Sequence, residues 1–256
     1  MTGRERQPER EEDTGRGGSN GALVAAVRDE ILANGGRITF ARYMDRALYH
    51  PVQGYYLSPE ARPGRGGDFL TAPELSPFFG RCLARQLRQV WDLLDRPAPF
   101  TVLEYGAGGG GLARDILSGA RDEAPAFAAA LRYVLQEINP YRREAARGLL
   151  DAAGFADRIA LEDPATPSAP PPPFVGAVIA NEFVDALAVH RVVGRDNALL
   201  ERYVRWDRGR DWFAEELDAP STPRLAAELA AGGVALADGQ SAEINLAAGE
   251  WLAAAG

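Results

Sequence analysis

Lysine is absent from this 256-residue chain, whose 28 Lys and Arg residues are all arginine. Schiff-base enzymes and Walker-type phosphate loops each depend on a lysine, so both classes are excluded. The chain has one cysteine, Cys82, and two histidines, His50 and His190. One cysteine cannot form an internal disulfide, and so few ligands of this kind argue against a zinc site. We therefore expect chemistry that uses no metal.

Long apolar runs and an excess of positive charge are missing too. No run approaches the ~20 residues that cross a membrane, and the formal net charge of −8 provides no basic field for nucleic acid. Residues 1–20 mix both charge signs with Gly and Pro, which predicts a disordered tail and not a secretory or mitochondrial signal. We expect a protein of the bacterial cytoplasm that does not bind nucleic acid and has no membrane span.

The middle of the chain alternates between strand and helix patterns. Strands are expected over 100–105, 133–138, 158–161 and 175–180, the last of them apolar throughout and buried on both faces. Helices are expected between them, from about Leu112 and over 140–153. This alternation predicts parallel βαβ units in a doubly wound, Rossmann-like α/β sheet.

The flanking parts of the chain have other patterns. Amphipathic helices are expected before the core, and short antiparallel strands followed by two Ala-rich helices are expected after it. We divide the chain into five regions: a disordered tail (1–20), an N-terminal helical and lid region (21–98), the cofactor-binding core (99–190), an antiparallel insertion (191–221) and C-terminal helices (222–256).

The strand over 100–105 runs into the stretch Gly106-Ala107-Gly108-Gly109-Gly110-Gly111. Glycines at this position let the backbone approach a ligand closely, and the N-terminus of the next helix offers free N–H groups. Three of these glycines match the dinucleotide fingerprint GxGxxG, and Glu137 at the end of the next strand can take a ribose hydroxyl pair.

The same layout serves S-adenosylmethionine, whose carboxylate then lies near the loop. The acidic Glu104, two residues before the first glycine, favours this version. The interval from Gly111 to Glu137 exceeds the ~20 residues usual for a dinucleotide site. Taken by itself, the loop leaves both cofactors open.

Three further segments narrow the choice. They read His50-Pro51-Val52-Gln53-Gly54-Tyr55-Tyr56, then Gly67-Asp68-Phe69-Leu70-Thr71-Ala72-Pro73-Glu74-Leu75-Ser76, and later Ala180-Asn181-Glu182-Phe183-Val184-Asp185-Ala186-Leu187. With the glycine loop, the chain resembles the MidA-like family of S-adenosylmethionine-dependent methyltransferases over roughly residues 20–256. The resemblance implies S-adenosylmethionine as cofactor. It also implies methylation of an arginine in a protein substrate, which for mitochondrial members is a core subunit of respiratory complex I.

Two features depart from that family. Its glycine loop reads like E-L-G-P-G-R-G-T-L, whereas Ala107, Gly109 and Gly111 stand here at the Pro, Arg and Thr positions. The core also shows four strand patterns, without the fifth strand and the terminal antiparallel pair of a methyltransferase sheet. We therefore expect a chain truncated at its C-terminal end, with the last core strands missing.

The predicted site lies at the carboxyl edge of the sheet, where doubly wound folds bind their ligands. An arginine acceptor is cationic and pairs well with carboxylates, so the residues after the fourth strand are predicted to act on the acceptor: Glu182, Asn181 and Asp185. The resemblance suggests that the segment before the core covers the cofactor. The predicted cofactor contacts are Glu104, Gly106, Gly108, Gly110, Glu137, Asp68, Thr71 and Glu74.

Simpler structural roles are expected for other reactive side chains. We expect Cys82 to be a small core residue, His190 to be a structural histidine with a satisfied ring, and His50 to cap or pack at the end of a helix. Two other functions stay open. One is a catalytically silent, truncated relative that binds a partner protein; the other is a nicotinamide-dependent oxidoreductase.

Overall fold

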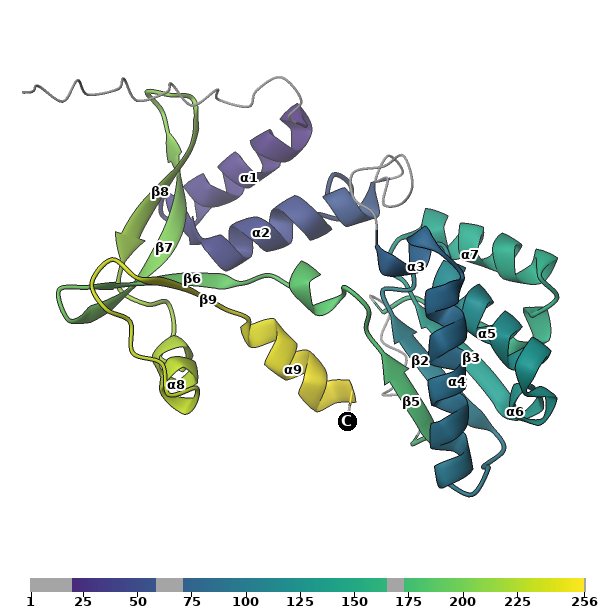
Figure 1. The fold of residues 1–256 in the computed structure, drawn as a ribbon. Coiled ribbons are helices and arrows are strands. Elements are labelled where there is room, and N and C mark those ends of the chain that lie inside the picture. Colours follow the sequence, from purple (N-terminus) through teal and green to yellow (C-terminus); the bar gives the residue numbers. More distant parts are fainter. Residues whose placement is uncertain (1–19, 59–70, 165–172, 256) are drawn as a thin grey trace, which may run out of the picture.

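The computed structural model describes residues 20–58, 71–164 and 173–255. Figure 1 shows them as two bodies, one built around a parallel sheet with helices α4 to α7 and the other around an antiparallel sheet with helices α1, α2 and α8. The expectations for the tail and for Asp68 lie outside the described residues.

The parallel sheet contains β2 (Phe100–Tyr105), β3 (Leu131–Gln136), β4 (Ile159–Glu162) and β5 (Gly176–Ile179). Their order is β4-β3-β2-β5, and every neighbouring pair is parallel. The first strand, β2, therefore lies inside the sheet. The chain adds β3 and β4 on one side of β2 and then crosses back to add β5 on the other side. The predicted doubly wound α/β fold is confirmed, and in the described part of the chain this sheet has four strands, as its sequence pattern predicts.

Four helices pack against this sheet: α4 (Phe78–Leu93), α5 (Gly111–Glu123), α6 (Pro125–Ala130) and α7 (Pro140–Ala152). Small residues let α4 and α5 come close, because a Cβ at Gly80 would lie 2.5 Å from the Cβ of Asp115. The core between helices and sheet is apolar, and Phe100 and Phe127, both fully buried, lie in edge-to-face contact at 5.7 Å. This packing fixes the carboxyl ends of the strands.

Two expectations about this body are wrong. Strand β5 is not buried on both faces: Val178 is 41% exposed, because β5 pairs only with β2 in the described residues and lies at the edge of the sheet. Cys82 is exposed and not a core residue. Helix α4 buries Ala84, Leu87 and Trp91, and a residue two positions before Ala84 points away from that face.

The second body joins segments from both ends of the chain. Its sheet consists of β1 (Arg37–Thr39), β6 (His190–Arg195), β7 (Ala198–Asp207), β8 (Trp212–Asp218) and β9 (Ser241–Ile244), and β7 pairs with β1, β6 and β8. The sheet thus takes strands from three of the predicted regions. β1 and β9 are not predicted from the sequence, since three and four residues carry little period-2 signal.

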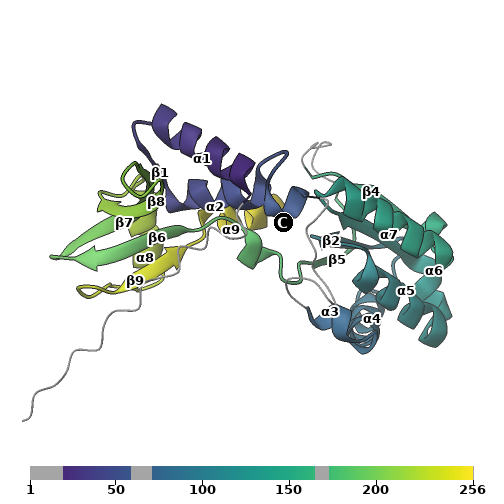
Figure 2. The same cartoon turned by 90° about the horizontal axis from the view of Figure 1, so that it is seen from above.

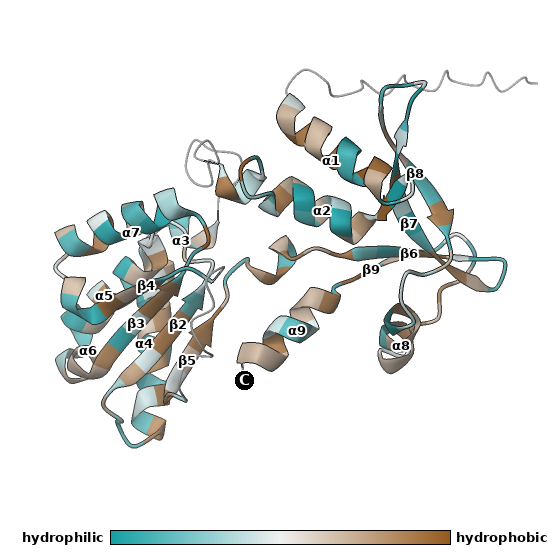
Figure 3. Ribbon diagram, turned by 180° about the vertical axis from the view of Figure 1, so that it is seen from behind, coloured by the Kyte–Doolittle hydropathy of each residue, from teal (hydrophilic) through white to brown (hydrophobic). Residues whose placement is uncertain are grey.

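Helices complete this body: α1 (Gly21–Ala33), α2 (Phe40–Tyr49) and α8 (Arg224–Ala231). Asn20 and Thr39 cap α1 and α2 with their side-chain oxygens. Helix α1 contains brown apolar segments in Figure 3, and its residues Val27 and Ile31 are buried in one cluster with Ile38 and Val204 of the antiparallel sheet. The helix expectations for this region agree with the structure.

The two histidines are structural in this fold. The His190 ring lies 2.7 Å from the carboxylate of Glu201, which is fully buried and also accepts a hydrogen bond from the N–H of Ser221. Burial alone would raise the pKa of Glu201, but these hydrogen bonds outweigh it and the pKa is lowered. The His50 ring accepts a hydrogen bond from the N–H of Gln53 in the turn after α2. Both arrangements agree with the expected structural roles.

The C-terminal helix α9 (Leu246–Ala255) connects the two bodies. Asn245, just before it, donates a hydrogen bond to the carbonyl of Val184 in the short helix η4 (Val184–Ala186) after β5. Trp251 packs against Tyr105, the last residue of β2, and against Phe183, which follows β5. Figure 2 shows α9 lying between the bodies. None of the helices in the described residues is long and apolar enough to span a membrane.

Candidate cofactor and acceptor site

A cavity of about 1170 Å³ opens at the carboxyl ends of β2, β3 and β5, and residues of both bodies line it. The parallel body contributes the glycine loop, Gln136 to Ile138, and Asn181 to Phe183; the antiparallel body contributes side chains of α2 and α9. Ligand pockets for single small molecules are usually ~300–1,000 Å³. The cavity therefore has room for a nucleoside-sized cofactor together with an acceptor side chain.

The glycine loop forms the floor of this cavity. Gly106, Gly108 and Gly110 have φ values of 66°, 56° and 77°, a region that side chains other than glycine rarely adopt. The N–H groups of Gly106 and Ala107 both donate to the carbonyl of Gln136, which ties the loop to the end of β3. Gly110 does not line the cavity. It turns the chain into α5 with its Cα against Ala146, where a Cβ would meet that side chain at 3.0 Å.

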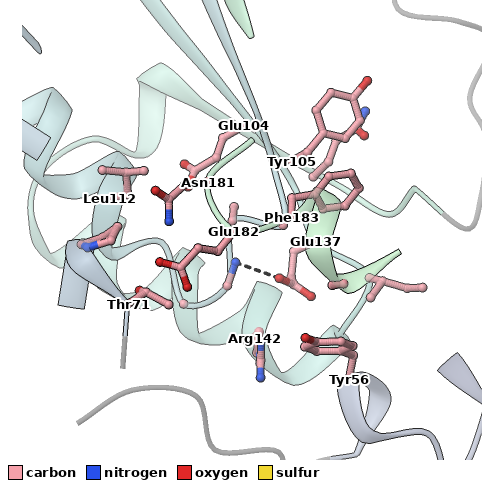
Figure 4. A pocket seen from close by; sticks show the side chains of 18 of the residues that line it. Tyr56, Thr71, Glu104, Tyr105, Leu112, Glu137, Arg142, Asn181, Glu182 and Phe183 are labelled. Carbon is pink, nitrogen blue, oxygen red and sulfur yellow. Dashed lines mark hydrogen bonds between the residues drawn. The ribbon is translucent and has the colours of Figure 1, made fainter. Parts of the chain in front are cut away.

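Glu137 lies directly after β3 and faces the loop. One carboxylate oxygen accepts the N–H of Gly108 and the other accepts the N–H of Asn139, both at 2.8 Å. The side chain is 5% exposed, and Figure 4 shows the bond to the loop as a dashed line. Each oxygen can accept a further bond, so Glu137 is held in place with acceptor capacity left for a ligand.

Glu104 lines the same cavity from within β2. It is 4% exposed and accepts a hydrogen bond of 2.8 Å from the hydroxyl of the fully buried Tyr133. Burial raises the pKa of Glu104 to about 8, and the nearby charge of Glu137 adds to this, while the Tyr133 hydrogen bond acts against it. With a pKa of about 8, Glu104 is mostly protonated at pH 7.

Asn181 and Glu182 follow β5 and reach the cavity from the opposite side of β2. Glu182 has a φ of 48°, a left-handed conformation that costs a side-chain-bearing residue on the order of 1 kcal/mol. Figure 4 shows both side chains gathered with Glu104 and Glu137 around the glycine loop. Next to them the rings of Tyr105, Phe183 and Trp251 pack with centroids 5.2–5.6 Å apart and form an aromatic wall.

Most of the predicted site residues thus lie around one cavity. The lining includes Glu104, Gly106, Gly108, Glu137, Thr71, Glu74, Asn181 and Glu182. Thr71 and Glu74 also serve a turn, because the N–H of Thr71 donates to the Glu74 carboxylate at 3.0 Å. Gly110 and Asp185 are not part of the lining, and Asp68 lies outside the described residues.

Other lining residues escaped the sequence analysis. Asp45 and Tyr49 come from α2, Arg142 from the first turn of α7, and Trp251 from α9. The buried Arg142 Nη2 and Trp251 Nε1 have no hydrogen-bond partner within the described residues. Such orphaned donors on a cavity wall fit a polar ligand. Arg142 could have been found from the sequence, because it lies in the first turn of the helix predicted over 140–153, directly after a core strand. The side chains of α2 and α9 could not, because only the folded chain brings these helices to the cavity.

Comparisons with known proteins agree with this geometry. Residues 82–256 match the family described as "Putative S-adenosyl-L-methionine-dependent methyltransferase". The fold matches a crystal structure of a Burkholderia thailandensis protein bound to S-adenosyl-homocysteine, with a TM-score of 0.78 and 34% identity over 91% of this chain and 58% of that one. A native crystal structure from the same organism matches with a TM-score of 0.73.

Curated relatives are similar over a shorter part. The mitochondrial protein arginine methyltransferase NDUFAF7 homolog of Drosophila melanogaster is 41% identical over 98 residues, which are 38% of this chain and 22% of the relative. Human NDUFAF7, with the same activity in its name, is 39% identical over 82 residues, which are 32% of this chain and 18% of the relative. The matched part is therefore well under half of these relatives' length.

The comparisons decide between the cofactors that the glycine loop left open. Both the matching family and the bound ligand of the Burkholderia protein point to S-adenosylmethionine, as predicted, and neither supports the nicotinamide alternative. The family model covers more than half of the chain, and the structural match extends over nearly all of it. By fold, by cavity and by sequence, this chain belongs to the S-adenosyl-L-methionine-dependent methyltransferase family.

Proposed function

We propose that the protein transfers a methyl group from S-adenosylmethionine to an arginine side chain of a protein substrate. The observation that carries the choice of acceptor is the charge of the cavity. Its ionisable lining comprises the acidic residues Asp45, Glu74, Glu104, Glu137 and Glu182 and the basic residues Arg114 and Arg142. Arg114 is paired with Asp115 at 2.8 Å, and Asp45 is paired with Arg42 at 3.2 Å. Even with Glu104 neutral, Glu74, Glu137 and Glu182 outnumber Arg142, so the cavity lining has an excess of carboxylates for a cation.

The residues at the end of β3 and in the glycine loop fit the cofactor. When bound, S-adenosylmethionine supplies a methyl group on a sulfonium that needs no further activation. We assign the ribose hydroxyls to Glu137, and the two backbone N–H groups that fix its carboxylate support this assignment. The free N–H groups at the start of α5 suit the cofactor's carboxylate. Arg142 and Tyr56 lie on the same side of the cavity as Glu137.

Glu182 and Asn181 suit the acceptor. A carboxylate binds a guanidinium through paired, charge-assisted hydrogen bonds, which orient the attacking nitrogen and balance its charge during transfer. Asp185 is not part of the cavity lining. Burial raises the pKa of the half-buried Tyr56, and the nearby charge of Asp185 raises it further. We therefore assign the direct acceptor contact to Glu182 and a more distant electrostatic effect to Asp185.

The test is a transfer assay with methyl-labelled S-adenosylmethionine and arginine-containing proteins, followed by acid hydrolysis and detection of methylarginine. We expect Glu182→Gln to lower kcat by about 100-fold, as for loss of a charged group that acts on the reacting centre. Glu144→Gln is the matched control, because Glu144 is exposed on α7 and outside the cavity. Equal rates for both variants would contradict the assigned role.

The relatives' names support an arginine acceptor, because the Drosophila and human proteins are both named protein arginine methyltransferases. By the same resemblance we propose a subunit of respiratory complex I as the type of substrate. The same assay separates this function from the silent, partner-binding alternative: bound cofactor without transfer to any arginine would favour the latter.

A further inference from the structure

Asn139 occupies an unusual position beside the cofactor end of the cavity. It is 1% exposed and is the N-cap of α7, where its side-chain oxygen accepts the N–H groups of Tyr141 and Arg142 at 2.9 and 3.2 Å. Its own backbone N–H donates to Glu137. These bonds account for a helix cap and for one contact with the predicted ribose-binding carboxylate.

The amide nitrogen of Asn139 has a separate task. Nδ2 donates to the carbonyls of Tyr56 and Ser58 at 2.8 and 3.2 Å, across more than 80 positions of sequence. A cap requires only the oxygen, so these two bonds are not explained by the start of α7. They fasten the segment 55–58, which comes from the antiparallel body, to the end of β3.

The fastened segment continues to the acceptor side of the cavity. The Tyr56 ring lines the cavity and stacks on Tyr49 at 5.4 Å, and the Tyr49 hydroxyl donates to the carbonyl of Ala186 at 2.9 Å. Ala186 lies in the turn that follows Glu182. A continuous set of contacts therefore runs from the glycine loop through Glu137 and Asn139 to the loop after β5.

We propose that Asn139 is a positioning residue. By fastening the segment 55–58, and with it the Tyr56 ring, beside Glu137, it holds the nucleoside end of the cofactor. The proposal rests on the proposed function, since it assumes S-adenosylmethionine or its product as the ligand. It assigns cofactor affinity to an amide group that touches no reacting atom. It also predicts that a substitution can keep the N-cap of α7 while removing the hydrogen bonds to the segment 55–58.

Asn139→Ser separates them. A serine hydroxyl still caps a helix, whereas its short side chain cannot reach the two carbonyls and adds no charge. Asn20→Ser is the matched control, because Asn20 caps α1 in the same way and its amide donates to Gln53 at 2.7 Å, away from the main cavity. Asn139→Thr is a second uncharged variant that also keeps a hydroxyl cap if the serine variant folds poorly.

Calorimetric titration with S-adenosylhomocysteine and with adenosine measures the effect, and thermal unfolding reports the cap. We expect Asn139→Ser to raise the Kd of both ligands by about ten-fold, the effect of losing two hydrogen bonds of ordinary strength. Its unfolding temperature should fall somewhat more than that of Asn20→Ser, because the two lost bonds come from a buried side chain, but the protein should stay folded at the temperature of the titration. Binding within two-fold of the unmodified protein in both Asn139 variants would overturn the proposal while leaving the proposed function intact. Failure of the unmodified chain to bind either ligand would overturn both.

Discussion

At the scale of single residues, two acids on neighbouring strands have different environments. Glu137, just after β3, accepts two backbone N–H groups, whereas Glu104, within β2, has one phenol donor. Burial raises the pKa of Glu104 to about 8, so the site contains one acid that is neutral at pH 7. A cationic ligand that enters the cavity would favour the ionised form of Glu104.

The raised pKa gives a stability prediction with a definite sign. The unfolded chain releases the Glu104 proton near 4.5 and the folded protein near 8. Between these values the folded state binds more protons, so its free energy of unfolding falls as pH rises. Glu104→Gln has no proton to lose and still offers Tyr133 an acceptor. We expect this variant to be more stable than the unmodified protein by ~3–5 kcal/mol at pH 9 and to differ little at pH 5.

Urea denaturation of the two proteins at both pH values measures this difference. Equal changes in unfolding free energy from pH 5 to pH 9 would show that Glu104 is already ionised in the folded protein. Glu201→Gln serves as a comparison carboxylate outside the cavity, since the pKa of Glu201 is lowered and its stabilising effect is lost as pH falls.

The sequence predicts which residues form the site better than it predicts their protonation. The sequence indicates Glu104 and Glu137 because each has a fixed position relative to the glycines. It does not show that Tyr133 lies against Glu104, or that Asn139 donates to Glu137, because both contacts depend on strand pairing and on a helix cap. Charge state follows from these neighbours and therefore required the fold.

At the scale of elements, the glycine loop contains two kinds of glycine. Gly108 and Gly110 have positive φ values, whereas Gly109 does not. A Cβ at Gly108 or Gly109 would meet nothing within 4 Å, but one at Gly110 would lie 3.0 Å from the Cβ of Ala146. Backbone strain and packing can therefore be separated within three consecutive residues.

Alanine substitutions along this loop should have graded effects on unfolding free energy. We expect Gly109→Ala to cost nothing, because alanine restricts the unfolded chain and fits the native angles. Gly108→Ala should cost about 1 kcal/mol for the left-handed backbone alone. Gly110→Ala should cost more, since it adds a contact with α7. Denaturant titration measures all three, and equal costs at Gly108 and Gly109 would contradict the described loop conformation.

The aromatic wall gives a second test at this scale. Trp251 is half-buried against Tyr105 and Phe183 and lines the cavity, whereas its neighbour Leu252 is 65% exposed. We expect Trp251→Ala to lower the free energy of unfolding by ~2 kcal/mol, less than for a fully buried tryptophan. Leu252→Ala, the control in the same helix, should change it by less than ~0.5 kcal/mol. Similar losses in both variants would show that α9 is not docked by Trp251.

At the scale of the whole molecule, the two bodies differ in how far the sequence predicts them. The parallel sheet follows from local patterns, because β2 and β3 are each followed by a helix. The antiparallel sheet requires β1 to pair with β7 and β9 with β6, contacts between distant segments that no local window contains. For the same reason the sequence indicates the glycine loop and the carboxylates after β5, but not the α2 and α9 side chains that close the cavity.

The cavity therefore belongs to the assembled molecule and not to the parallel body alone. Helices α2 and α9 supply Asp45, Tyr49 and Trp251 to the cavity lining. Asn139 holds the segment 55–58, which follows α2 in the chain. In a folded protein these parts should create one cofactor site per chain.

Isothermal titration of the complete 256-residue chain with S-adenosylhomocysteine tests this claim most directly. We expect saturable binding with one site per chain, and loss of most of that affinity in Glu137→Ala. Circular dichroism of the same samples establishes that both proteins are folded. A folded, unmodified chain that gives no heat of binding would contradict the central claim.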